Sequence, residues 1–111
     1  MISIIIPVFN EAQRIAPILR YLMRAGDAAR ISEIIVVDGH STDGTRKRAE
    51  EVMAHSTIPL RILSSEKGRA RQMNMGASKA NGTILYFLHV DSYPPIHFDR
   101  HITTAVQAGN E

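Results

Sequence analysis

The sequence contains no cysteine among its 111 residues, which excludes disulfide scaffolds, thiolate metal sites and cysteine nucleophiles. Long hydrophobic runs are also missing, because none approaches the roughly 20 apolar residues that a membrane helix requires. The apolar start of the chain has no basic segment before it and is interrupted by Pro7, so it does not resemble a signal peptide. We therefore expect a cytoplasmic chain with no membrane span.

An excess of charge of one sign is lacking as well. Lysine and arginine total 13 against 11 acidic residues, a formal net charge of +2. This balance is too weak to favour nucleic acid or an anionic membrane as a partner. With 44% hydrophobic and 22% charged residues, the chain has the composition of one globular domain.

Three nucleotide-binding and catalytic motifs are absent from the sequence: G-x-G-x-x-G, G-x-x-x-x-G-K-[ST] and G-x-S-x-G. Their absence argues against a dinucleotide-dependent dehydrogenase, a P-loop nucleotidase and an α/β-hydrolase, respectively.

Apolar runs alternate with amphipathic segments along the chain. Residues 11–25 carry apolar side chains at helical spacing, with Asn10 and Gln13 as a start resembling a capping box and Gly26 as a stop. The continuously apolar runs are typical of strands buried on both faces of a parallel sheet. The sequence predicts strands at 2–6, 31–37, 60–63 and 83–90, and helices at 11–25, 42–55, 68–80 and from 94 onward.

This order of elements predicts an α/β fold with a Rossmann-like parallel sheet sandwiched by helices. No repeat, linker or low-complexity segment divides residues 1–111. Because α/β enzymes often continue with further strands, we expect the fold to be incomplete at the C-terminus and to form the first part of a larger domain.

Polar residues follow three of the predicted strands. In an open parallel sheet, ligands bind outside the carboxyl ends of the strands, so segments far apart in the sequence should converge on one edge. The residues are Asn10 and Glu11 after the first strand, Asp38, His40, Ser41 and Asp43 after the second, and His89, Asp91 and Ser92 after the fourth.

Each of these motifs also has a purely structural interpretation. Asn10 is explained well as a helix cap, which is the stronger local interpretation. Asp38 could accept a hydrogen bond from a base or a ribose, or could simply begin an Asp-Gly turn followed by a Ser/Thr cap. The local sequence leaves both alternatives for Asp38 open.

A basic segment opens the third predicted helix. Lys67, Arg69 and Arg71 lie where cations oppose the helix dipole, and a diphosphate would relieve that cost. Asn74 and Gly76 would allow close approach of the backbone. A solvated basic surface explains the same residues equally well.

His89 and Asp91 are two residues apart and should point to the same side of a strand. Together they could hold a divalent cation that bridges two phosphates, although a hydrogen-bonded His beside a strand-ending Asp is the common alternative. His97 and His101, four residues apart, form a rival metal pair, but two exposed helix residues explain them better.

Taken together, these segments resemble the family 2 glycosyltransferases, which have the GT-A nucleotide-sugar fold. The resemblance rests on SIIIPVFNE, EIIVVDGHSTDGT and ILYFLHVDSYPP, and KGRARQMNMGA is similar to a subgroup with K-G-R-x-x-Q-M-N-x-G. The order and spacing of these segments match along essentially the whole chain.

The resemblance implies a role for each candidate residue. Asp38 would bind the base, Asp43 would support its loop, and Arg71 would lie near the base or the diphosphate. Asp91 would occupy the last position of the family's D-x-D and bind Mn²⁺ or Mg²⁺, with His89 standing where an Asp is common. The nucleotide-sugar-binding residues implied are Pro7, Asn10, Glu11, Asp38, Asp43, Arg71 and Asn74.

The implied activity is inverting, metal-assisted transfer of a sugar from a nucleotide-diphosphate sugar to an unknown acceptor. The catalytic base and the acceptor site are expected beyond Glu111, so residues 1–111 would be the donor-binding portion, inactive alone. The alternative is a non-catalytic nucleotide-binding or scaffold module of the same fold. A nucleotidyltransferase ranks last, because no Gly- and Arg-rich loop follows the first strand. An exposed sheet edge also predicts a homo-oligomer.

Overall fold

The structure, a computed structural model, describes residues 1–108. Within them, strands and helices alternate, and the strands form one parallel sheet in the order β3-β2-β1-β4. The predicted α/β fold class is confirmed. The elements are β1 (Ile2–Val8), α1 (Ile15–Ala25), β2 (Ile31–Asp38), α2 (Thr45–Met53), β3 (Leu60–Ser64), α3 (Arg69–Lys79), β4 (Ile84–Phe87) and α4 (Phe98–Gln107).

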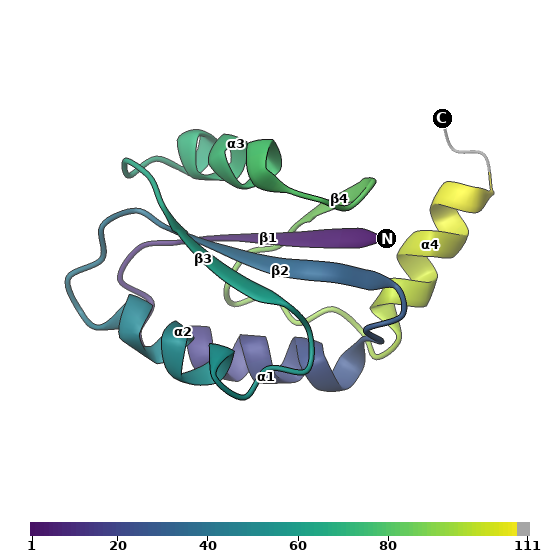
Figure 1. The fold of residues 1–111 in the computed structure, drawn as a ribbon, viewed down its shortest axis with the longest axis horizontal. Coiled ribbons are helices and arrows are strands. Elements are labelled where there is room, and N and C mark those ends of the chain that lie inside the picture. The colour runs from purple at the N-terminus through teal and green to yellow at the C-terminus, as the bar shows by residue number, and fades with distance from the viewer. Residues whose placement is uncertain (109–111) are drawn as a thin grey trace.

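Helices cover both faces of the sheet. Figure 1 shows α1 and α2 below the strands, α3 above them, and α4 beside the N-terminal end of β1. The main core lies between the sheet and α1, while a smaller cluster of Ile5, Ile35 and Val37 faces α3. The two central strands are therefore buried on both faces, as their continuously apolar sequences predict.

The fourth strand differs from its prediction. It is shorter than residues 83–90, and Leu85 and Phe87 are 41% and 44% exposed. Their register opposite Ser3 and Ile5 places them on the α3 face, and α3 packs mainly over β1, β2 and β3. The prediction that this strand is buried on both faces is wrong, because β4 is an edge strand with one face partly uncovered.

The starts of the first two helices also differ from prediction. Asn10 does not cap α1, which begins at Ile15; instead Asn10 has a φ of 52° and accepts a hydrogen bond from the distant Thr42. The second helix begins at Thr45 rather than at residue 42, and its last residue, Met53, is exposed. Gly26 ends α1 as predicted, and its N–H donates to the carbonyl of Leu22 at 3.0 Å.

Among residues 1–108, every helix is too short or too polar to pass through a bilayer.

Candidate functional site

The strand order reverses at β1, which has β2 on one side and β4 on the other. A crevice is expected outside the carboxyl ends of the strands at such a reversal, and the structure has a pocket of about 200 Å³ at that point. The end of β1, the start of α3 and the loop after β4 form its walls. The lining residues are Pro7, Val8, Phe9, Glu11, Lys67, Gly68, Arg69, Gln72 and His89.

The loop after β1 is joined to the loop after β2. Backbone N–H groups of residues 10–12 donate to side chains of residues 41–45, and the Asn10 side chain accepts one bond in return, so the loops form one interlocked unit. The bonds run from Asn10 N to Ser41 Oγ (2.8 Å), from Thr42 N to Asn10 Oδ1 (2.8 Å), from Glu11 N to Thr45 Oγ1 (2.9 Å) and from Ala12 N to Asp43 Oδ2 (3.1 Å).

Asp43 holds this unit together through its carboxylate. Its Oδ1 accepts hydrogen bonds from the hydroxyl and the N–H of Thr45. The Thr45 hydroxyl is the largest cause that lowers the pKa of Asp43, and the N–H of Ala12 adds to it. Asp43 therefore supports the loop as an ionised side chain, on the outer side of the pocket wall.

Asp38 ends β2, directly beside Val8 of the pocket wall in the sheet register. It is 4% exposed, and its carboxylate accepts hydrogen bonds from the N–H of Ser41 at 3.2 Å and from the Ser41 hydroxyl at 2.5 Å. The side chain thus lies at the predicted edge, but Ser41 occupies it and it does not line the pocket.

Two cations face the pocket from the start of α3. Lys67 and Arg69 flank Gly68, and neither forms an ion pair with a residue of the described range 1–108. The Lys67 ammonium lies 4.0 Å from the centre of the Phe9 ring, a cation–π distance. The pocket is therefore electropositive where α3 begins.

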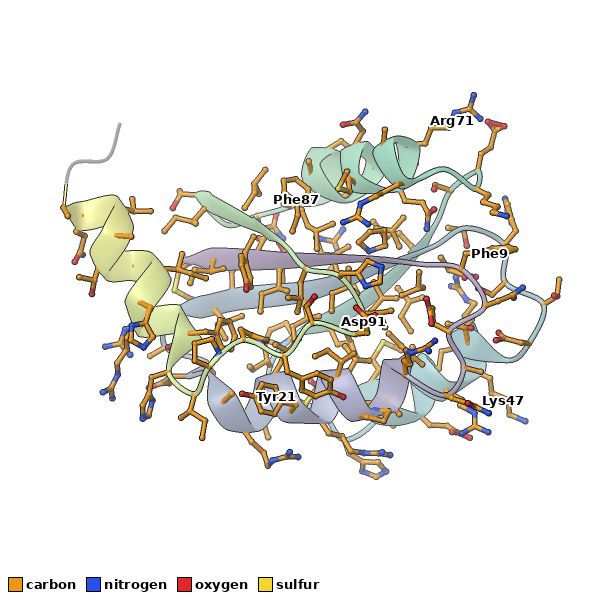
Figure 2. The ribbon with its side chains drawn as sticks, turned by 180° about the vertical axis from the view of Figure 1, so that it is seen from behind. Phe9, Tyr21, Lys47, Arg71, Phe87 and Asp91 are labelled. Carbon is orange, nitrogen blue, oxygen red and sulfur yellow. The ribbon has the colours of Figure 1, made fainter. Side chains whose placement is uncertain are left out.

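Arg71 and Asn74 lie outside this pocket. Arg71 is exposed and pairs with Glu66 at 3.0 Å, and Figure 2 shows its side chain pointing away from the sheet at the outer end of α3. Asn74 is exposed on the same helix. The structure does not bring these two residues to the pocket wall, and their roles stay predictions.

His89 and Asp91 lie together in the loop after β4. Their Nδ1 and Oδ1 atoms are 2.5 Å apart, and both side chains are about half exposed, at 42% and 59%. Figure 2 shows Asp91 in this loop, between the end of β1 and α1. One imidazole and one carboxylate beside a pocket suit Mg²⁺ or Mn²⁺, which usually take one or two carboxylates and complete their shell with phosphate and water. The donor set therefore fits such an ion.

No larger metal-ligating group occurs in the described part of the chain, since no three His, Asp or Glu side chains cluster between residues 1 and 108. In the rival pair, His97 immediately precedes α4 and His101 lies on it, and both are exposed. Helix α4 lies near the N-terminal end of β1 rather than at the pocket.

The loop that carries the pair is fastened to α1. The Tyr21 hydroxyl donates to the carbonyl of Pro94, and the ring of Tyr21 meets Tyr93 edge to face with centroids 5.0 Å apart. Figure 2 shows Tyr21 on α1, below this returning loop. His89 and Asp91 are thus held between β4 and this attachment.

Sequence reasoning offered Lys67 and Arg69 either for a diphosphate or as a solvated surface without choosing between them, and it did not assign Phe9 or Gln72 to the site. Phe9 and Gln72 lie inside the quoted motifs PVFNE and KGRARQMNMGA, so their segments were found. No local signal identifies Gln72, because its partners Val8 and Val37 lie 64 and 35 residues away in the sequence.

Residues 3–111 match the family described as Glycosyl transferase family 2. The match covers nearly the whole chain, so the chain belongs to this family. The resemblance that the sequence motifs indicate is thereby confirmed.

Relatives and solved structures extend this finding. The chain is 33% identical over 94 residues to glycosyltransferase AglE of Haloferax volcanii, covering 84% of this chain and 31% of that protein. It is 24% identical over 110 residues to dolichol-phosphate mannosyltransferase of Pyrococcus furiosus, covering 99% of this chain and 31% of that protein. The chain thus spans less than a third of the length of these relatives.

Among solved structures, the mannosyltransferase PcManGT from Pyrobaculum calidifontis in complex with GDP-Man and Mn²⁺ matches with a TM-score of 0.82 and 26% identity. The match covers 99% of this chain and 32% of that one. S. aureus TarS 1–349 in complex with UDP-GlcNAc matches with a TM-score of 0.81 at 22% identity, over 96% of this chain and 31% of that one. These likenesses confirm the GT-A type of fold.

Proposed function

We propose that this chain forms the donor-binding part of a glycosyltransferase that moves a sugar from a nucleotide-diphosphate sugar to an acceptor. The observation that carries the proposal is the pocket at the reversal of the strand order, where Lys67 and Arg69 face the end of β1 without an acidic partner in the described chain. Family membership and the GDP-Man and UDP-GlcNAc named for the two similar structures support the same class of donor.

The diphosphate would bind at the start of α3. The first N–H groups of a helix and its dipole favour anions, and Lys67 and Arg69 add two full positive charges at the same place. Arg71 and Asn74 lie on the outer surface of this helix, so a role for Arg71 requires that it leave Glu66.

The nucleoside would lie along the ends of β1 and β2. Phe9 offers an aromatic ring for a base, once Lys67 leaves its face for a phosphate. Pro7 and Glu11 would border the nucleoside from the pocket wall. Asp38 would accept a base N–H if it shares its carboxylate with Ser41.

Two further predicted residues would act through the loops. Asn10 and Asp43 form the bonds that interlock the loops after β1 and β2, so they would shape the nucleoside site without facing the donor.

Asp91, assisted by His89, would hold Mn²⁺ or Mg²⁺ beside the diphosphate. Such an ion neutralises the negative charge that develops on a departing diphosphate. The role of the chain's own residues is to present one carboxylate oxygen and one ring nitrogen on a fastened loop.

Transfer with inversion needs a base that deprotonates the acceptor hydroxyl. Glu11 is the one acidic residue that lines this pocket, and its carboxylate pairs with Arg14 at 2.9 Å. We therefore assign the base to no residue of the described range 1–108. The same observation favours, as the second candidate, a module that binds a nucleotide without transferring sugar.

Calorimetric titration with UDP and with GDP, in the presence and absence of Mn²⁺, tests the proposal. We expect binding that Mn²⁺ strengthens and that the double variant Lys67→Ala/Arg69→Ala weakens. Arg100→Ala, a cation removed from α4 at the other end of the sheet, serves as the control. Absence of binding at millimolar nucleotide, with the fold intact, would reject the donor site. Binding without sugar transfer by any longer form of the protein would favour the second candidate.

A further inference from the structure

Helix α3 meets the sheet through an unusual pair of residues, a glutamine and a glycine. Its two buried residues are Gln72 and Gly76, one turn apart. A Cβ atom at Gly76 would lie 2.5 Å from Cγ2 of Ile5, so the helix backbone sits close to β1. Gln72, 4% exposed, is thereby pressed onto the carboxyl ends of β1 and β2.

The Gln72 amide makes three hydrogen bonds to backbone groups. Its Nε2 donates to the carbonyls of Val8 at 2.8 Å and of Val37 at 2.9 Å, and its Oε1 accepts the N–H of Gly68 at 3.1 Å. The N–H of Gln72 in turn donates to the carbonyl of Gly68 at 2.8 Å, an exchange similar to a capping box. Both amide donors are used, as a buried polar group requires.

These contacts join two walls of the donor pocket, the end of β1 and the start of α3, to the neighbouring end of β2. Val8 immediately precedes Phe9, and Val37 immediately precedes Asp38. The third partner, Gly68, lies between Lys67 and Arg69. One side chain therefore fixes the basic turn relative to the ends of both strands.

We propose that Gln72 is a positioning residue of the donor site, which holds the Lys67–Arg69 turn in its binding position before the nucleotide arrives. The inference rests on the proposed function. A turn held in advance loses little conformational freedom on binding, and this preorganisation raises affinity. Replacement of Gln72 frees the turn and leaves the carbonyls of Val8 and Val37 without this donor.

A second residue, Gly39, packs closely against the Gln72 amide and restricts its position. Gly39 is buried, and a Cβ atom there would lie 3.1 Å from both Cδ and Oε1 of Gln72. Gly39→Ala should therefore displace the Gln72 amide without changing Gln72 itself. The two positions give independent tests of one contact.

The test uses Gln72→Met, which keeps the volume and removes the amide, together with Gly39→Ala. Val52→Ala, a truncation in the core under α2, is the control for lost stability away from the pocket. Each is titrated with UDP and GDP plus Mn²⁺, unfolded in urea, and followed by amide hydrogen exchange at Gly68. We expect Gln72→Met and Gly39→Ala to weaken nucleotide affinity about 10-fold and to accelerate exchange at Gly68. Val52→Ala should lower stability with affinity unchanged.

Gln72→Glu adds a readout that a merely structural role would not produce. An ionised carboxylate cannot donate to Val8 or Val37, whereas a protonated one restores a single donor. Relative to the unmutated chain at the same pH, the nucleotide affinity of Gln72→Glu should therefore recover as the pH falls. If Gln72→Met fails to fold, Gln72→Glu and Gly39→Ala carry the comparison.

Unchanged affinity in Gln72→Met and Gly39→Ala, while Gly68 exchanges faster, would overturn the positioning role. Unchanged exchange at Gly68 would overturn it as well, because the turn would then be held by other groups. Failure of the unmutated chain to bind any nucleotide would instead reject the proposed function, and with it the donor-site role of Gln72.

Discussion

The carboxylate of Asp43 accepts a hydrogen bond from the N–H of Ala12 at 3.1 Å, although 31 residues separate the two in sequence. This bond joins the loop after β1 to the loop after β2. The pKa of Asp43 is lowered, first by the Thr45 hydroxyl and then by the N–H of Ala12. The rim of the pocket thus depends on an ionised carboxylate.

Asp43→Asn should lower the stability of the chain at neutral pH. Because the folded pKa of Asp43 lies below its ordinary value of 3.8, its stabilisation is present above that pH and is lost as the pH falls through the folded pKa. The stability difference between the variant and the unmutated chain should therefore disappear in acid. Urea unfolding at neutral and acidic pH measures it, with the exposed Glu51→Gln as control. A difference that persists in strong acid would contradict this role.

Glu33→Gln should destabilise the fold by about 1.5–3 kcal/mol, the range for hydrogen bonds to a charged group. Glu33 is buried at the amino-terminal edge of the sheet and accepts bonds from Ser3, Arg61 and the N–H of Asn81. Burial by itself would raise the pKa of Glu33, but the bonds from Asn81, Arg61 and Ser3 outweigh it and the pKa is lowered.

The lowered pKa of Glu33 determines how its contribution to stability changes with pH. Its contribution is present above the ordinary pKa of 4.5 and is lost as the pH falls through the lower folded pKa. Urea unfolding should show the loss from Glu33→Gln shrinking below pH 4.5. A loss that grows in acid would show that the pKa of Glu33 is raised instead.

Asp91→Asn should remove most of the effect of Mn²⁺ on nucleotide binding. The variant keeps the shape of the side chain but loses the charge that faces His89. Calorimetry gives the ratio of nucleotide affinities with and without Mn²⁺. We expect this ratio to be at least about 10-fold smaller for Asp91→Asn than for the unmutated chain. His101→Ala, on α4, is the matched control and should respond like the unmutated chain. An equal Mn²⁺ effect in Asp91→Asn would exclude Asp91 as a ligand.

Gly76→Ala should destabilise the chain by about 1–3 kcal/mol, the usual cost of overpacking. The added methyl group would meet Ile5 at 2.5 Å and push α3 away from β1. Ser78→Ala, on the exposed side of the same helix, should change the unfolding midpoint little. Equal midpoints for the two variants would mean that α3 can shift without cost.

Leu85→Lys should suppress self-association. Leu85 and Phe87 are exposed on the edge strand β4, and we propose that this edge pairs with a second copy of the chain. Light scattering at high concentration should show a dimer or a larger species for the unmutated chain and a monomer for the variant. A monomeric unmutated chain at every concentration would reject the proposal.

Much of the fold could be predicted because its signals are local. The β-branched runs that became β1 and β2 and the helical spacing of α1 lie within single segments. The predictions for Asn10 and β4 were wrong because both features depend on contacts between segments that are distant in the sequence. The partner of Asn10 is Thr42, 32 residues away, and the exposure of Leu85 depends on the position of β4 at the sheet edge.

The same contrast between local and long-range signals applies to the candidate site. Glu11 and His89 could be placed at the pocket because the apolar runs located the carboxyl ends of the first and fourth strands to within a few residues. Gln72 could not, since its partners Val8 and Val37 lie 64 and 35 residues away. The choice among the cations depends on where α3 begins, because each residue turns the helix by about 100°, and Arg71 consequently faces solvent.

The hydrogen bond from Tyr21 to Pro94 affects the order in which parts of the structure unfold. It anchors the stretch that follows Asp91 onto α1, so that His89 and Asp91 are tethered on both sides. Loss of this anchor would leave the pair attached through β4 alone, a short strand at the margin of the sheet. Mild denaturation should then abolish the proposed binding of Mn²⁺ or Mg²⁺ while the central strands are still paired.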